Sequence, residues 1–345
     1  MFPERVLSGM RPTGLLHLGH YHGVLKNWVK LQNEFPCLFF VADWHALTTH
    51  YETPEVIKEN VWDMVVDWLA AGVDPEKATL FVQSKVPEHA ELHLLLSMNT
   101  PLSWLERVPT YKDQQEKLSD KDLGTYGFLG YPLLQSADIL IYRATQVPVG
   151  EDQVPHIELT REIARRFNHF YSKEKLLDAK GAEIGRKPIL LEPKALLTEA
   201  SKMPGLDGMK MSKSYQNTLA LRETPENISQ KVRKMPTDPA RVRRTDPGDP
   251  AKCPVWQLHE VYSDASTKQW VQEGCKSAGI GCIQCKEPII QAVTDELAPM
   301  RERAAMYTEN PTLVRKIISE GCERARAMAN DTMQDVRKHM GLDYS

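Results

Sequence analysis

The first two thirds of the chain alternate short apolar runs with longer segments in which apolar residues recur every three or four positions. The apolar runs lie at residues 5–10, 37–44, 78–84 and 146–153, and such continuous runs are typical of strands buried on both faces of a parallel sheet. The periodic segments lie at residues 17–34, 53–72, 88–99, 131–142 and 154–167, with the spacing of helices that bury one face. Strands that alternate with helices predict an α/β fold whose ligands bind at the carboxyl ends of the strands.

One of these helices has recognisable ends. In the segment 53–72 we expect Thr53 as the N-cap, Pro54 at the first helical position and Gly72 as the stop.

Beyond about residue 223 the strand pattern fades. Residues 224–235 and 311–340 have helical spacing, and residues 237–254 form a proline-rich irregular connector. We therefore expect two domains, an α/β domain over residues 1–222 and a mostly helical domain over residues 223–345.

Composition places the chain among ordinary soluble proteins. It has 345 residues, 41% hydrophobic and 26% charged, which is enough to bury a large core. No apolar run approaches the roughly 20 residues that cross a bilayer, and the N-terminus lacks the pattern of a signal peptide. We expect a cytosolic protein with no membrane partner.

Charge gives a local signal only. The net charge of -3 does not indicate nucleic-acid binding. The segment 231–244, however, holds six basic residues against one aspartate. It is either a phosphate-facing patch or a solvated basic helix and loop.

Two short motifs point to phosphate chemistry. The first expected strand-to-helix turn is "GMRPTGLLHLGH", residues 9–20, with His17 and His20 in the opening turn of the helix. A helix N-terminus binds anions through its free N–H groups, and the two imidazoles add donors, although paired histidines are also often structural. The chain has no G-x-G-x-x-G, which argues against the usual dinucleotide site.

The second motif is "GMKMSKSYQN", residues 208–217, where Lys210 and Lys213 flank Met211 and Ser212. A basic loop of this kind can follow a polyphosphate whose charge changes during a reaction. Each motif alone is suggestive. Together on one α/β scaffold, nearly two hundred residues apart, they are a strong signal.

These motifs carry a family resemblance. His17-Leu18-Gly19-His20 and Lys210 to Ser214 resemble the paired HIGH and KMSKS signatures of class I aminoacyl-tRNA synthetases. Further segments resemble the tryptophan-activating branch of that family, through nearly all of the chain and in the family's order; they are "FVADWHALTT", "LERVPTYK", "YPLLQSADILIY", "VPVGEDQ" and "HIELTREIARRFN". The resemblance implies a Rossmann-like catalytic domain, a homodimer, and ligation of L-tryptophan to tRNA(Trp) with ATP and Mg²⁺.

The resemblance also implies roles for individual residues. His17, His20, Lys210 and Lys213 would be catalytic. The ATP contacts would be Arg11, Pro12, Thr13, Gly19, His20, Gly150, Glu151, Asp152, Met203, Lys210, Met211, Ser212, Lys213 and Ser214, with Lys112 as a looser match. Asp138, Tyr131, Gln153 and His45 would hold tryptophan.

Physical reasoning supports Asp138 independently. Indole is a large apolar ring system with one donor, so a selective pocket needs an apolar wall and one buried acceptor. Asp138 lies in the apolar context "LLQSADILIY". The alternative is a helix-capping or ion-paired carboxylate. Other histidines, such as His89, His93 and His259, are interpreted as surface or packing residues.

The implied reaction is in-line attack of the tryptophan carboxylate on the α-phosphate of ATP, followed by transfer to a terminal ribose hydroxyl of tRNA. Three alternatives stay open: an adenylate-forming nucleotidyltransferase that uses no tRNA, a tyrosine-specific relative, and a non-catalytic, redox-sensing RNA-binding protein.

Four cysteines in the last third of the chain form the pattern C-x21-C-x6-C-x2-C, namely Cys253, Cys275, Cys282 and Cys285. Stable disulfides are rare in the cytosol, so the short C-x2-C pair favours a metal, either zinc or a 4Fe-4S cluster. Zinc sites usually come as two short pairs, which tilts the reading toward iron and sulfur. The resemblance implies the same choice, because a subset of the tryptophan-activating branch carries a similar set of cysteines and binds a 4Fe-4S cluster with it.

Overall fold

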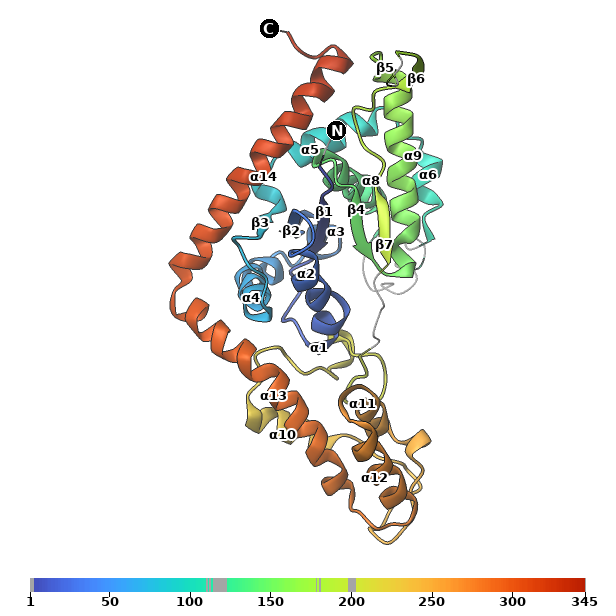
Figure 1. The fold of residues 1–345 in the computed structure, drawn as a ribbon, viewed down its shortest axis with the longest axis vertical. Coiled ribbons are helices and arrows are strands. Elements are labelled where there is room, and N and C mark those ends of the chain that lie inside the picture. Colours follow the sequence, from blue (N-terminus) through green and yellow to red (C-terminus); the bar gives the residue numbers. More distant parts are fainter. Residues whose placement is uncertain are drawn as a thin grey trace.

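A five-stranded parallel sheet forms the centre of the upper part of the molecule (Figure 1). Its order is β3-β2-β1-β4-β7. The strands are β1 Val6–Met10, β2 Cys37–Val41, β3 Ala78–Val82, β4 Gln146–Val149 and β7 Lys194–Leu197, and a separate antiparallel pair is formed by β5 Lys175–Leu177 and β6 Glu183–Arg186. The computed structural model describes residues 3–109, 111, 113, 123–177, 179, 181–197 and 203–344, except for the side chain of Ser214.

Helices cover the sheet and form the narrower lower part of the molecule. Those of the first 222 residues are α1 Leu18–His20, η1 Tyr21–Leu25, α2 Lys26–Leu31, α3 Asp43–His50, α4 Glu55–Ala71, η2 Gln83–Lys85, α5 Glu88–Ser97, α6 Leu102–Glu106, α8 Tyr126–Ile141, η3 Glu151–Gln153, α9 Val154–Tyr171 and η4 Lys213–Tyr215. Those that follow are α10 Pro225–Lys234, η5 Pro250–Lys252, α11 Pro254–Tyr262, α12 Ala265–Lys276, α13 Cys282–Glu309 and α14 Pro311–Met340. This confirms the predicted fold class, an α/β sheet followed by a mostly helical region. The two-domain boundary at residue 222 stays a prediction.

Several predicted elements need correction at their ends. The expected helix over residues 17–34 is broken into α1, the π-helical turn η1 and α2, and π turns are frequent near functional sites. The strand expected through Trp44 ends at Val41, and Asp43 already starts α3. The N-cap of α4 is Pro54 without a side-chain cap bond, so the Thr53 prediction was wrong by one residue. Gly72 ends that helix, as predicted, with φ of 106°.

Neighbouring residues of each strand supply the two faces of the sheet, because successive side chains in a strand point to opposite sides. Phe39 and Leu80 pack with α2, α4 and α13 in one apolar cluster, while Leu38 and Phe81 pack with α5, α8 and α9 in the other. This explains why the strands read as continuous apolar runs.

Helix α14 crosses the edge of the sheet at β3. Its first half contributes Val314 and Ile318 to one apolar cluster, and its second half contributes Ala325 and Met333 to the other. At the crossing point Gly321 lies against the strand, where a Cβ would come within 1.8 Å of the Leu80 carbonyl oxygen. The helix therefore covers an edge that would otherwise be open to pairing, and only glycine allows this approach.

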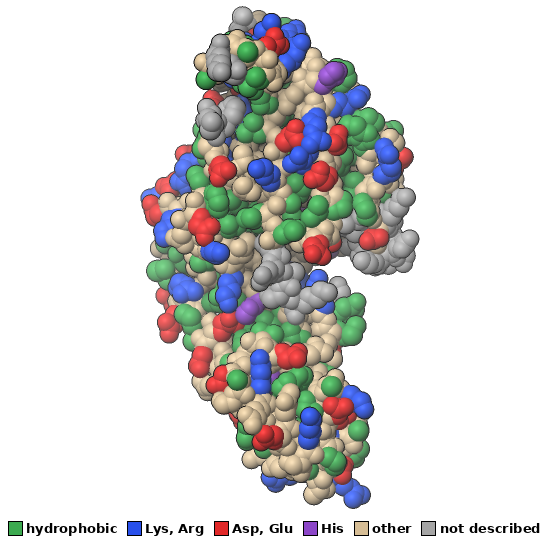
Figure 2. Space-filling view, turned by 45° about the vertical axis from the view of Figure 1, so that its right-hand side comes forward, with side chains coloured by type: hydrophobic (Ala, Val, Ile, Leu, Met, Phe, Trp, Pro, Cys, Tyr) green, Lys and Arg blue, Asp and Glu red, His purple; other side chains and the backbone are tan. Residues whose placement is uncertain are grey.

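The basic segment 231–244 is partly engaged within the protein. Lys231 pairs with Glu223, Arg233 pairs with Glu287, and Arg241 is buried. On the face shown in Figure 2, basic and acidic side chains are interspersed. Half of the six basic residues are thus held by protein groups rather than directed only to a partner.

Among the helices of the described residues, none is both long and apolar enough to span a membrane.

Replacement of Gly321 by alanine should destabilise the fold. The added Cβ overlaps backbone at Leu80, so α14 must move off the sheet edge, and we expect a loss of about 1–3 kcal/mol in the free energy of unfolding. Gly127→Ala in α8 is the matched control, because a Cβ there meets nothing within 4 Å and alanine favours a helix. Urea denaturation of both variants measures the difference. Equal stability of the two would contradict the proposed packing of α14.

Candidate active site

A cavity lies where the strand order reverses between β1 and β4. Its volume is about 490 Å³, and its wall includes the end of β1, Gly9 to Arg11, and the end of β4, Val147 to Gly150. In open parallel sheets, the carboxyl ends of strands at such a reversal form a natural crevice for ligands. The topology therefore places the site where the sequence pattern predicted.

Asp138, on α8, forms part of this wall and is almost completely buried. Gln83 Nε2 donates to both of its carboxylate oxygens at 2.9 Å. His45 Nε2 donates to Oδ2 at 2.7 Å, and His89 Nδ1 donates to Oδ1 at 2.5 Å. A carboxylate offers about four acceptor positions, and these three side chains occupy all of them.

This environment keeps Asp138 ionised. Burial acts to raise the pKa of its carboxyl group, but the interaction with His89 and the hydrogen bonds from His45 and His89 outweigh it and lower the pKa to about 2. His89 Nε2 in turn lies 2.7 Å from the hydroxyl of Tyr142, which donates to it. The floor of the cavity thus holds a permanent negative charge.

The two histidines of the first motif accept hydrogen bonds from backbone N–H groups at the start of α1. His17 is the N-cap of α1 and its Nδ1 accepts from the N–H of Gly19 at 3.1 Å, while His20 Nδ1 accepts from the N–H of His17 at 3.2 Å. Burial, together with the nearby Lys213, lowers the pKa of His17 to about 4; burial, together with His17 and Lys213, lowers the pKa of His20 to about 2. Both rings are therefore neutral at pH 7.

The Lys210 to Ser214 loop is organised by one amide. Asn217 Oδ1 accepts from the N–H of Ser212 at 2.8 Å, and its Nδ2 donates to Asp207 Oδ1 at 2.7 Å and to the carbonyl oxygen of Lys210 at 3.2 Å. Met211 and Met203 are buried in the core beneath the loop. The loop is thus tied to the core while Lys210 stays exposed.

Lys213 joins the two motifs. Its Nζ donates to the carbonyl oxygen of Gly14 at 2.7 Å, and its charge acts on both His17 and His20. Burial lowers the pKa of Lys213 to about 8, in spite of the opposing effect of Asp67. At pH 7 the side chain is still mainly a cation, placed beside two neutral imidazoles.

The structure gathers part of the predicted set around the cavity. Seven of the predicted residues line it: Arg11, His20, His45, Tyr131, Asp138, Gly150 and Gln153. The others lie outside the lining of the described cavity; they are Pro12, Thr13, His17, Gly19, Glu151, Asp152, Met203, Lys210, Met211, Ser212 and Lys213. The side chain of Ser214 is not among those that the structure describes. Lys112 falls outside the described residues.

The four cysteines face a second, smaller pocket at the lower end of the molecule. Cys253, Cys275, Cys282 and Cys285 line it together with Thr237, Asp238, Arg241 and Val255. All six cysteines of the chain are described, and all are free thiols. In the described part of the chain, no group of three or more His, Cys, Asp or Glu side chains is arranged to hold a single metal ion. The four cysteines are thus brought together, and the metal remains a prediction.

Sequence reasoning missed residues that act through others. Gln83 and His89 hold Asp138, and Asn217 holds the basic loop. His89 and His259 were interpreted as surface or packing residues; His89 instead contacts Asp138, and His259 Nε2 lies 3.4 Å from Cys285 Sγ. Only the closeness of Asn217 to the KMSKS motif could have signalled any of them.

Known proteins resemble this chain throughout. The family described as tRNA synthetases class I (W and Y) matches residues 3–298. The tryptophan–tRNA ligase of Ralstonia nicotianae is 62% identical, with 100% of both chains covered, and that of Thermotoga maritima is 52% identical, with 99% of this chain and 100% of the relative covered. The crystal structure of Campylobacter jejuni tryptophanyl-tRNA synthetase with ADP and tryptophan superposes with a TM-score of 0.84 at 31% identity, covering 98% of this chain and 100% of the other.

Proposed function

The chain belongs to the class I tRNA synthetases for tryptophan and tyrosine, and we propose that it activates L-tryptophan with ATP and transfers it to the 3′ end of tRNA(Trp). The full-length relatives at 62% and 52% identity are tryptophan–tRNA ligases. ATP with Mg²⁺ is typical of this family. A cytosolic location is part of the proposal, because free thiols remain reduced there.

The buried carboxylate of Asp138 carries the proposal of tryptophan as the substrate. An indole N–H needs one buried acceptor in an otherwise apolar cavity, and Asp138 lies in the cavity wall beside Phe40, Ala42 and Ile139. Its four acceptor positions are already used, so the indole N–H must replace one donor. His45 is the donor that lines the cavity, whereas Gln83 and His89 are fully buried behind it. We assign His45 as the donor that gives way.

Adenylate formation needs no general base. The tryptophan carboxylate oxygen attacks the α-phosphorus of ATP, the bond from that phosphorus to the bridging oxygen breaks, and pyrophosphate leaves with the electron pair. Bound magnesium would neutralise part of the phosphate charge. The nucleophile is already an anion, so the protein's task is to position it and to stabilise the charge on the leaving group.

The two motifs divide that task. The imidazoles of His17 and His20 are neutral at pH 7, so they act by hydrogen bonding rather than by positive charge. Lys213 supplies the cation, with Arg11 in the cavity wall and the exposed Lys210 as further positive charges. In this arrangement the neutral imidazoles donate hydrogen bonds near the α-phosphate, and the cations lie near the departing pyrophosphate. Negative charge develops on the pyrophosphate during the reaction, so the cations are placed to stabilise it.

Transfer to tRNA completes the reaction. The terminal ribose 2′-hydroxyl attacks the carbonyl carbon of the adenylate, and AMP leaves. We propose that residues 1–222 perform the chemistry and that residues 223–345 contact the tRNA, including its anticodon. Support comes from the lower helices, which extend away from the sheet (Figure 1), and from the exposed Lys234 at the end of α10.

Tryptophan should support ATP–pyrophosphate exchange, and Asp138→Asn should lower kcat/KM for tryptophan at least about 100-fold, because an amide directs its N–H groups at donors that need an acceptor. Asp335→Asn, a carboxylate of α14 that pairs with Arg143 and is half-exposed, is the control and should stay near wild type. Exchange with tyrosine and none with tryptophan would overturn the assignment.

We also propose that Cys253, Cys275, Cys282 and Cys285 hold a 4Fe-4S cluster, with zinc as the alternative. The four cysteines line one small pocket at the lower end of the molecule. Their sequence pattern has one short C-x2-C pair and two single cysteines rather than two short pairs, which favours iron and sulfur over zinc.

The donor set itself favours a positive occupant. Burial and the three neighbouring thiols raise the pKa of Cys285 to about 12, so four thiolates could share the pocket only around a cationic group. Arg241 Nη1 lies 3.9 Å from Cys275 Sγ and its Nη2 donates to the carbonyl oxygen of Ile280 at 2.5 Å. When bound, a cluster would cross-link η5, α12 and α13 and so fix the shape of the lower region.

Protein purified without oxygen should be brown and contain iron and sulfide near four of each per chain. Cys285→Ser should lose this colour and raise the KM for tRNA, while tryptophan-dependent pyrophosphate exchange persists, because that chemistry lies in the other region. Cys322→Ser, a lone thiol on α14, is the matched control and should retain the cluster. Colourless protein with one zinc per chain would overturn the cluster, and equal losses in both assays would overturn the division of tasks.

A homodimer is the expected assembly, supported by exposed apolar side chains along α5 and α6. Leu94 of α5, Met98 directly after it and Leu102 at the start of α6 are 54%, 68% and 60% exposed; large exposed apolar side chains are frequent at contact sites. Light scattering should give twice the chain mass, and Met98→Asp should weaken the assembly. Asp in place of the exposed Val242 is the control. A monomer at micromolar concentration would contradict the proposal.

A further inference from the structure

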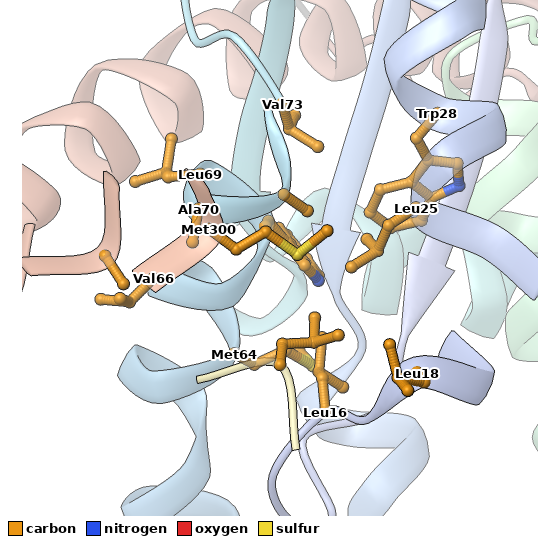
Figure 3. Packing of buried hydrophobic residues seen from close by; sticks show 14 of the residues in the cluster. Leu16, Leu18, Leu25, Trp28, Met64, Val66, Leu69, Ala70, Val73 and Met300 are labelled. Carbon is orange, nitrogen blue, oxygen red and sulfur yellow. The ribbon is translucent and has the colours of Figure 1, made fainter. Parts of the chain in front are cut away.

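Asp67 is a buried carboxylate that belongs to neither motif but lies beneath both. It is on α4 and only 1% exposed. Figure 3 shows the apolar side chains of this region, with Met64 of the same helix near Leu16 and Leu18. Placing a carboxylate in such a setting is costly unless its oxygens are paired.

The two oxygens of Asp67 face two different segments. Oδ2 accepts from the N–H of Leu16 at 3.3 Å, directly before His17. Oδ1 lies 2.8 Å from Nε of Arg222. Arg222 is at the end of the segment that follows the Lys210 to Ser214 loop. The carboxylate thus contacts the first motif with one oxygen and the continuation of the second motif with the other.

Those two segments are also paired by their backbones. The N–H of Leu18 donates to the carbonyl oxygen of Leu219 at 3.0 Å, and the N–H of Leu221 donates to that of Leu16 at 3.1 Å. His17 and Ala220 form the antiparallel bridge between these bonds. Asp67 stands at the end of this short ladder and ties both of its strands to α4.

The charge of Asp67 also reaches the reacting region. Its negative charge raises the pKa of Lys213, in opposition to burial and to Arg11. Lys213 Nζ is fixed on the carbonyl oxygen of Gly14, in the loop that Leu16 continues. A neutral amide at position 67 could still accept the Leu16 hydrogen bond, so the feature peculiar to a carboxylate here is its charge.

We propose that Asp67 is a positioning residue of adenylate formation, which clamps the His17–His20 loop to the segment after the Lys210 to Ser214 loop and holds Lys213 as a cation. This rests on the proposed function, since it concerns the same reaction. Asp67 does not line the cavity, so it acts through Leu16, Arg222 and Lys213.

A matched carboxylate provides the control. Asp63 lies one turn earlier on α4, and its Oδ1 accepts from Arg222 Nη2 at 2.8 Å. Its side chain is 47% exposed. Asp63→Asn and Asp67→Asn therefore remove the same charge from the same arginine, but only the second removes the charge that opposes the deprotonation of Lys213.

The test is tryptophan-dependent ATP–pyrophosphate exchange from pH 6 to pH 9. Asp67→Asn should lower kcat about 10- to 100-fold, the size of effect expected from a misplacement near 1 Å, with KM for tryptophan changed less than about two-fold. Asp63→Asn should keep kcat within about two-fold of wild type. Equal kcat values for the two variants would overturn the proposal.

The pH profile separates charge from mere packing. The groups facing Asp67 are Arg222, Asp63 and the Leu16 N–H, and those facing Lys213 are Asp67, Arg11, His17 and His20. The negative charge of Asp67 raises the pKa of Lys213. Removing that charge should lower the pKa of Lys213, so the alkaline loss of activity should begin at lower pH in Asp67→Asn. An unchanged alkaline limb would overturn the electrostatic part of the proposal.

If circular dichroism shows that Asp67→Asn does not fold, two variants of its partner Arg222 provide a second test. Arg222→Gln should lower kcat more than Arg222→Lys, which keeps a cation against Asp67; equal effects would overturn the proposal. If the wild type itself shows no tryptophan-dependent exchange, the proposed function fails. If the wild type is active and the variants are equal, only the role of Asp67 fails.

Discussion

The structure depends on the short backbone ladder between residues 16–18 and 219–221. The two motifs lie nearly two hundred residues apart in the chain, and closing such a loop carries an entropy cost that local contacts must repay. Leu16, Leu18, Leu219 and Leu221 are all buried to 1% exposure or less. The ladder is therefore packed into the apolar core. It fixes the positions of the His17–His20 loop and of the segment after the Lys210 to Ser214 loop.

Two buried carboxylates show how environment divides the work of one residue type. Asp138 has three polar side chains around it, which overcome burial and lower its pKa to about 2. Asp67 has one backbone N–H and one arginine, and burial raises its pKa to about 6. The first is an unconditional anion, suited to recognition of a donor in a cavity. The charge of Asp67 depends on its contacts with the Leu16 N–H and Arg222, so it depends on the positions of both segments that Asp67 connects.

Much of the fold and part of the site were predictable from local sequence. Continuous apolar runs predicted β1 to β4, and three residues singled out in the sequence, Arg11, His20 and Asp138, line the cavity at the strand-order reversal. β7 and α13 were not predicted. The short run of β7 has no strong pattern, and α13 carries two internal prolines that would normally argue against a helix. Gln83 and His89 were missed because their partner Asp138 is distant in sequence, and no local spacing records such contacts. Asn217 lies close to its partners Lys210 and Ser212, but its sequence position does not show that its side chain holds the loop.

The long helix α13 connects the lower end of the molecule to the region of α4 beside the sheet. It begins at Cys282 and Cys285 beside the cysteine pocket, where it packs with α10, α11 and α12, and continues to Met300 and Ala304 in the core beside α4. Twenty-eight helical residues extend about 42 Å at 1.5 Å per residue. Because α4 carries Asp67, a single element joins the cysteine pocket to the helix beneath both motifs. The distance between the proposed tRNA-reading end and the reacting end is thus set by helix geometry. Because α13 is one continuous helix, a shift at one end is carried to the other unless α13 bends, and its internal prolines Pro288 and Pro299 are the natural points for such a bend.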